Sequence, residues 1–126
     1  MSVHVRWPRW LAAMPEHMVL HAPFTPFTAS LALNATEHVV GRLARQAAAL
    51  GVSVVFVGGS MGQFDTMTVQ ERKDLATAWG KQGAALGLYV IFQVGQTVQA
   101  ESIELAQHAA SVAGVHAIAA VPPYYE

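Results

Sequence analysis

The stretch VVFVGGSMGQ, residues 54–63, decides how the rest of the chain is interpreted. Its first four residues are β-branched or aromatic, which favours a strand buried on both faces. Three glycines follow, Gly58, Gly59 and Gly62, and they let the backbone turn sharply and bring amide groups close to a ligand without a Cβ in the way. The stretch therefore predicts a buried strand, Ser53–Val57, that ends in a turn suited to binding.

A helix is predicted soon after this turn. Thr68 and Glu71 have the spacing of a capping box, in which the two side chains satisfy the first free amides of a helix. Apolar residues then recur until Gly87, so the helix is expected from Val69 to about Leu86. The side chains expected to face inward are Leu75, Ala78, Trp79 and Ala85.

Upstream of this unit, the sequence predicts one more strand and one more helix. The strand is expected near residues 17–22, before a loop with two prolines, which cannot join a strand ladder. Asn34 and Glu37 resemble a capping pair, and apolar residues at helical spacing then continue until Gly51.

Downstream, the pattern predicts a strand at 88–93, a helix from about Ala100 to Gly114 and a strand at 115–121. The residues at helical spacing in this helix are Ala100, Ile103, Ala106, Gln107 and Ala110. Strands and helices that alternate with short loops predict an α/β fold, with parallel strands joined by right-handed crossovers. Periodicity alone leaves open whether the sheet stays open or belongs to a barrel.

Composition excludes several classes of function. The chain has 126 residues, 53% of them hydrophobic, which is enough for one modest domain but short of the ~250 residues of a complete eight-stranded α/β barrel. A net charge of −1 without a basic run does not favour nucleic acid or an anionic membrane surface. The chain has no cysteine, its six histidines lack metal-binding spacing, and no apolar run reaches the ~18 residues of a membrane-spanning helix. No metal, cofactor or membrane is therefore expected, and the expected location is the cytoplasm.

Several motifs resemble, in the same order, the N-acetylneuraminate lyase and dihydrodipicolinate synthase family. GSMGQ at 59–63 and TVQERK at 68–73 are similar to its glycine-rich turn and the helix that follows. APFTPF at 22–27 is similar to the end of its first strand, and PPYY at 122–125 to the turn after its fourth strand. ESIELAQHAA at 101–110 is more similar to the lyase branch than to the synthase branch.

This resemblance implies that residues 17–126 are the first half of a TIM (β/α)8 barrel, with four parallel strands and three intervening helices. Residues 1–16 are then a poorly ordered leader or a cap at the bottom of the barrel. In this family a lysine amine forms a Schiff base with pyruvate, and the lyase cleaves sialic acid to N-acetylmannosamine and pyruvate. That lysine belongs to the sixth strand, beyond residue 126, whereas Lys73 and Lys81 are expected to be solvated helix residues. The chain alone is therefore expected to be inactive, and the implied partners are pyruvate, an amino sugar and further copies of the chain.

The resemblance also implies which residues meet the substrate. The backbone amides of Ser60 and Met61, between Gly59 and Gly62, occupy the places that hold the pyruvate carboxylate. Met61 stands where the family has a threonine of a proton relay, and a thioether cannot donate a proton. Thr25, in the first loop, is a further candidate for the cavity lining. The alternative for the glycines is a tight turn with no role in binding.

Tyr124 and Tyr125 match a tyrosine pair that reaches across a subunit interface toward the partner's site, although two aromatic residues here can equally be unused. Two alternatives to a lyase stay open. One is a dihydrodipicolinate synthase-like enzyme. The other is a non-catalytic half-barrel that acts as an interaction subunit through its open sheet edges.

Overall fold

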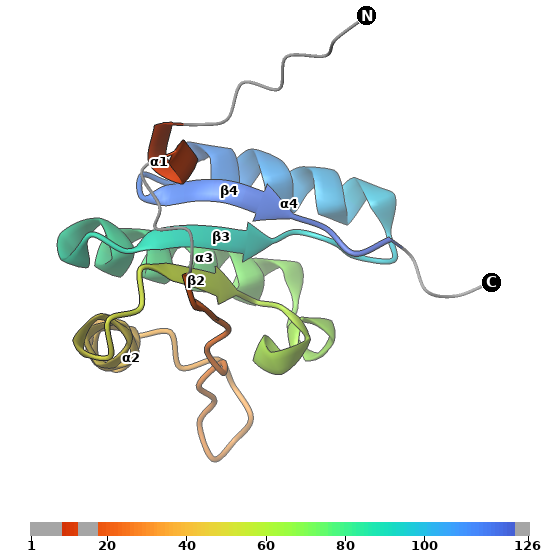
Figure 1. The fold of residues 1–126 in the computed structure, drawn as a ribbon. Coiled ribbons are helices and arrows are strands. Elements are labelled where there is room, and N and C mark those ends of the chain that lie inside the picture. The colour runs from red at the N-terminus through yellow and green to blue at the C-terminus, as the bar shows by residue number, and fades with distance from the viewer. Residues whose placement is uncertain (1–8, 13–17, 123–126) are drawn as a thin grey trace, which may run out of the picture.

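The structure, a computed structural model, describes residues 9–12 and 18–122, and it contains one sheet of four parallel strands (Figure 1). The strands lie side by side in chain order, which confirms the predicted parallel α/β fold. They are β1 (Leu20–His21), β2 (Val54–Val57), β3 (Tyr89–Gln93) and β4 (Val115–Ala119).

Three helices connect the strands, and two short 3-10 turns follow β2. The helices are α2 (Glu37–Ala49), α3 (Val69–Leu86) and α4 (Gln99–Ser111), and the turns are η1 (Ser60–Gly62) and η2 (Phe64–Thr66). A four-residue helix, α1 (Arg9–Ala12), lies in the segment expected to be a leader or a barrel cap, and that expectation stays a prediction. None of the described helices is long and apolar enough to cross a membrane.

One face of the sheet carries the hydrophobic core. Val55, Val57, Val90 and Phe92, from β2 and β3, are at most 1% exposed and join one apolar cluster with side chains of α2, α3 and α4, such as Trp79. Figure 1 shows α3 and α4 behind the sheet. The near-continuous apolar runs of β2 and β3 fit this position, because central parallel strands are buried by the helices that connect them.

Among the described residues, several side chains on the opposite face of the sheet are less buried. Phe56, Ile91 and Ala117 are register partners on β2, β3 and β4, and all three are half-buried. A doubly wound sheet has helices on both faces, whereas a barrel has them only outside. Strands in chain order with α2, α3 and α4 on one face therefore form the first half of a TIM (β/α)8 barrel, as expected.

The N-cap expected for α2 was wrong. Thr36, and not Asn34, precedes the helix, and its side chain accepts a hydrogen bond from the Val39 amide at 3.4 Å. Asn34 instead accepts a hydrogen bond from the Thr36 hydroxyl, at 3.4 Å. Since a cap must adopt extended backbone immediately before the first helical residue, the start at Glu37 selects Thr36.

Other boundaries and faces also differ from expectation. Ala85 of α3 is exposed, whereas Ala78 is partly buried and packs against the core as expected. In α4 the buried side chains are Leu105 and Ala109, whereas Ile103 is 51% exposed. The strand expected at 17–22 covers only Leu20–His21, that at 115–121 ends at Ala119, and α4 ends at Ser111 rather than near Gly114.

Candidate functional site

The glycine turn after β2 lies at the carboxyl end of the sheet, where barrel enzymes hold their substrates. Gly58 has φ +69°, a conformation that L side chains rarely adopt. A Cβ on Gly59 would lie 2.7 Å from the ring of Phe56, so a larger residue here would force that ring to shift. The turn then continues into η1, the single 3-10 turn Ser60–Gly62.

The amides of Ser60 and Met61 begin this 3-10 turn. Because the first amides of a helix have no acceptor within it, both can donate to a group outside. The side chains of both residues are exposed, and that of Met61 is 72% exposed. The backbone at this point is therefore suited to binding an anion, whatever the side chains contribute.

Thr25 contacts the glycine turn directly. Its hydroxyl donates a hydrogen bond of 2.6 Å to the Gly62 carbonyl oxygen, and the residue is only 8% exposed. A Cβ on Gly62 would lie 3.2 Å from the Thr25 hydroxyl, so the two segments pack tightly. The loop after β1 thus fastens the glycine turn.

Arg72 was not among the residues singled out from the sequence, although it is fully buried at this end of the sheet. Its Nη2 donates to the Gln93 carbonyl oxygen at 2.6 Å, and its Nη1 to the Gly95 carbonyl oxygen at 3.1 Å. The guanidinium carbon lies 5.3 Å from the centre of the Phe64 ring. Arg72 therefore ties the start of α3 to the loop after β3.

The position of Arg72 leaves a signal in the sequence. It falls on the same helical face as Leu75, Ala76 and Trp79, all of which are buried. Burial lowers the pKa of Arg72 from its ordinary value to about 10, and the nearby charge of Glu101 opposes that shift. A charge on an apolar stripe is thus the pattern that marks this residue.

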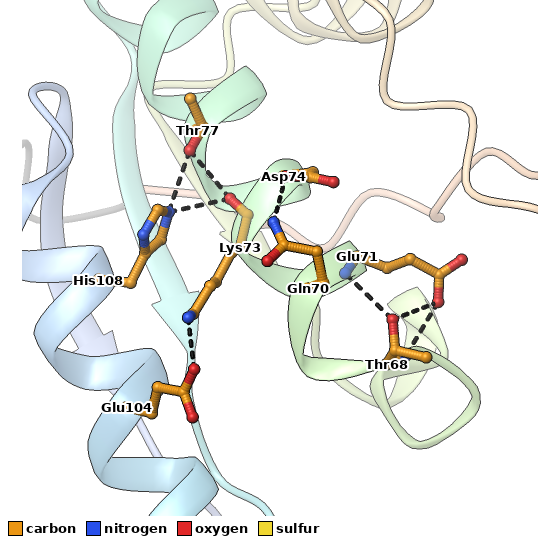
Figure 2. A network of polar contacts seen from close by, with 8 residues as sticks. All are labelled: Thr68, Gln70, Glu71, Lys73, Asp74, Thr77, Glu104 and His108. Carbon is orange, nitrogen blue, oxygen red and sulfur yellow. Dashed lines mark hydrogen bonds and ion pairs between the residues drawn. The ribbon is translucent and has the colours of Figure 1, made fainter.

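A surface network joins α3 to its own N-terminus and to α4 (Figure 2). The predicted capping box is confirmed, with Glu71 accepting from the Thr68 amide at 2.9 Å and the Thr68 hydroxyl accepting from the Glu71 amide at 3.2 Å. The hydrogen bond from the Thr68 amide lowers the pKa of Glu71 below its ordinary value. Lys73 pairs with Glu104 of α4 at 2.5 Å, and His108 Nε2 lies 3.0 Å from the Thr77 hydroxyl.

The remaining expected site residues are not all on this edge. Tyr124 and Tyr125 lie outside the described residues. Within 9–12 and 18–122, no group of three or more acidic or histidine side chains is arranged to hold a metal ion. A hollow of ≈ 500 Å³ lies beside α2, between Phe24 and Arg42, rather than at the glycine turn.

Comparison with known proteins identifies the family of this chain. The family model described as the dihydrodipicolinate synthetase family matches residues 16–126. The chain belongs to this family. The match includes the glycine turn and Arg72, so both lie within the family domain.

Individual relatives agree with this assignment. The N-acetylneuraminate lyase of Danio rerio is 37% identical over 107 residues, which are 82% of this chain and 33% of that protein. The structure of Proteus mirabilis N-acetylneuraminate lyase is similar with a TM-score of 0.75 and 30% identity, over 82% of this chain and 34% of that one. YagE, a prophage protein of the dihydrodipicolinic acid synthase family from E. coli K12 in complex with pyruvate, has a TM-score of 0.77 and 29% identity, over 86% and 35%. The chain thus spans about a third of the length of these relatives.

Proposed function

We propose that this chain carries the carboxylate-binding part of a pyruvate-dependent aldolase of the N-acetylneuraminate lyase type. The observation that supports it is the glycine turn at the carboxyl end of β2, with the amides of Ser60 and Met61 at its start, in a chain of this family. The complete reaction cleaves N-acetylneuraminate to N-acetylmannosamine and pyruvate. Pyruvate, whose carboxylate matches backbone donors, is the ligand proposed for this part of the site.

In this proposal the turn works through its backbone. The amides of Ser60 and Met61 hold the pyruvate carboxylate, and Thr25 keeps the turn in place through Gly62. The Met61 side chain supplies no hydroxyl for a proton relay, so that proton has to move through another group.

The Schiff-base lysine is proposed to come from a segment beyond residue 126. Both lysines of the chain are engaged on the surface of α3, Lys73 with Glu104 and Lys81 with Glu37 at 2.7 Å. These pairs direct the amines toward α4 and α2 rather than toward the glycine turn, so the chain alone is expected to form no Schiff base.

Two measurements test the proposal. Incubation with pyruvate and borohydride, followed by mass spectrometry, should show no covalent adduct, and an adduct on Lys73 or Lys81 would overturn the role of an external lysine. Titration with pyruvate, followed by NMR of the ¹⁵N-labelled chain, should shift the amide signals of Ser60 and Met61. Unchanged signals at saturating pyruvate would overturn the binding site itself.

A dihydrodipicolinate synthase-like activity is the enzymatic alternative, supported by the likeness to YagE of that synthase family. The curated relatives named N-acetylneuraminate lyase support the lyase instead. Assay of the complete gene product with both substrates decides, because each activity requires its own aldehyde or sugar partner.

A non-catalytic interaction subunit is the second alternative. Its support is the open edge at β4, where Ile118 is 51% exposed, since apolar strand edges favour pairing with another chain. A discrete oligomer in gel filtration would support self-association, for which Tyr124 and Tyr125 remain the predicted interface. For either activity the proposed location is the cytoplasm, which the lack of cysteine in the chain fits, and cell fractionation tests it.

A further inference from the structure

Gln93 is the last residue of β3, and the oxygen and nitrogen of its side-chain amide differ in their hydrogen bonding. The residue is 2% exposed, and its Oε1 accepts a hydrogen bond from the Gly95 amide. Because a backbone N–H can only donate, this bond fixes which end of the side chain is oxygen. The other end, Nε2, is buried and has no hydrogen-bond partner among the described residues.

An unpaired buried amide is unfavourable. Leaving such a donor without an acceptor destabilises the folded chain, and most buried polar side-chain atoms in proteins are paired. Since Gln93 Nε2 offers two N–H bonds that the described residues do not use, an oxygen atom supplied from outside them is the natural complement.

Strand geometry places Gln93 on the face of the sheet opposite α3. Val90 packs against α3, where its Cγ2 lies 2.6 Å from the Cβ position of Gly83. Side chains alternate along a strand, so Phe92 shares the face of Val90 and Gln93 lies on the opposite face. Phe92 pairs in register with Val57, the residue just before Gly58. Gln93 is therefore on the strand next to the glycine turn, one residue beyond the last pair that β2 and β3 form.

The backbone around Gln93 is held on both sides. Arg72 binds its carbonyl oxygen at 2.6 Å and that of Gly95 at 3.1 Å, and Ala119 of β4 is its register partner. A donor held in this way loses little conformational freedom when a ligand binds. Gln93 is thus prepositioned at the same edge as Ser60 and Met61.

We propose that Gln93 Nε2 donates a hydrogen bond to an oxygen of a small 2-oxo acid anion bound beside the glycine turn. The inference rests on the proposed function and adds a side-chain donor to the backbone donors of Ser60 and Met61. The amide is neutral and donates without adding a charge, so it suits a carboxylate or keto oxygen equally.

The test uses the full ¹⁵N-labelled chain, pyruvate as the probe and the variant Gln93→Glu. A glutamate keeps an acceptor for the Gly95 amide, but when ionised it has no donor and repels a carboxylate. In the wild type, the Gln93 side-chain amide signals should shift together with the Ser60 and Met61 amides. In Gln93→Glu at about pH 8, the affinity for pyruvate should fall about tenfold or more, because a hydrogen bond to a charged group contributes roughly 1.5–3 kcal/mol.

Lowering the pH tests whether Gln93 donates to the ligand or only holds the Gly95 turn in place. As the pH falls to about 4, below the ~4.3 of an ordinary glutamate, the new carboxyl group protonates and regains a donor, and the affinity of Gln93→Glu should recover toward the wild-type value. The matched control is Gln107→Glu, an exposed change of equal charge on α4, which should leave affinity unchanged at every pH. Circular dichroism at each pH confirms that the variants remain folded.

The outcomes distinguish the two proposals. If pyruvate shifts the Ser60 and Met61 amides but Gln93→Glu binds it as tightly as the wild type at every pH, Gln93 only holds the Gly95 turn and this inference fails, while the proposed function stands. If pyruvate shifts no amide of the turn in the wild type, both proposals fail.

Discussion

Phe92 and Ile118 are register partners on neighbouring strands, yet Phe92 is fully buried and Ile118 is 51% exposed. The difference reflects position in the sheet: β3 is central and has α3 against it, whereas β4 is an edge. The same contrast recurs at the other edge, where Leu20 of β1 is 46% exposed and its partner Val54 of β2 is 1% exposed. The central strands of the sheet are therefore fully buried by this chain alone. The two edge strands keep exposed apolar side chains, which the other strands of a barrel would cover.

The largest expected effect tests this contrast directly. Phe92→Ala should lower the free energy of unfolding by about 3–5 kcal/mol, since it removes a fully buried aromatic ring and leaves a cavity. Ile118→Ala should cost less than about 1 kcal/mol, because its side chain is already half in water. Urea unfolding followed by circular dichroism measures both. Equal losses would contradict the distinction between centre and edge.

The second prediction concerns the buried arginine that fastens the central strand. Arg72→Met should cost about 2 kcal/mol, because the carbonyl oxygens of Gln93 and Gly95 lose their donors. Arg42→Met, on the exposed side of α2, removes the same charge and should change stability by less than about 0.5 kcal/mol. The two variants are compared by urea unfolding at one pH. A loss of the same size in both would show that Arg72 does not hold the loop.

A smaller effect is expected at the helix that covers the centre of the sheet. Thr68→Ala should cost about 1 kcal/mol through loss of the α3 cap.

The pKa of Glu71 is lower in the folded chain than its ordinary value of 4.5, so its ionised form favours folding. This contribution is complete above pH 4.5 and is lost as the pH falls through the lower folded value.

Unfolding measured across this acidic range checks the helix-cap prediction. Glu71→Gln keeps an acceptor but does not titrate there, so the part of the pH dependence that comes from the cap should disappear in this variant. An unchanged pH profile would mean that the cap contributes nothing to it.

The smallest effect on stability is expected at the open edge, where association should change instead. Ile118→Lys places a charge on the β4 edge, so it should leave the unfolding free energy of the monomer within about 0.5 kcal/mol and weaken self-association. The control is Leu50→Lys, which adds the same charge away from the strand edges, at a residue after α2 that is 74% exposed. Analytical ultracentrifugation over a concentration series compares them. If both variants associate like the wild type, β4 is not the contact.

Expectation and structure agree best where a signal acts within a few residues. The capping box of Thr68 and Glu71 and the start of α3 at Val69 were correct, because the cap and the first helical turn are neighbours in the chain. The spacing noted in α4 did not identify its buried residues, which are Leu105 and Ala109, whereas Ile103 is 51% exposed. Small apolar residues occur all round that helix, so periodicity alone did not choose its buried side.

The sequence by itself determined the order of strands and helices and the turn at Gly58, which is the candidate site at the end of β2, because glycine backbone freedom and helix caps are local. Only the tertiary structure decided that α2, α3 and α4 share one face of the sheet and that Thr25 holds Gly62. The burial of Arg72 was also decided there, since its two carbonyl partners are 21 and 23 residues away in the chain. Such contacts depend on how separate elements pack, and no short stretch of sequence specifies that packing.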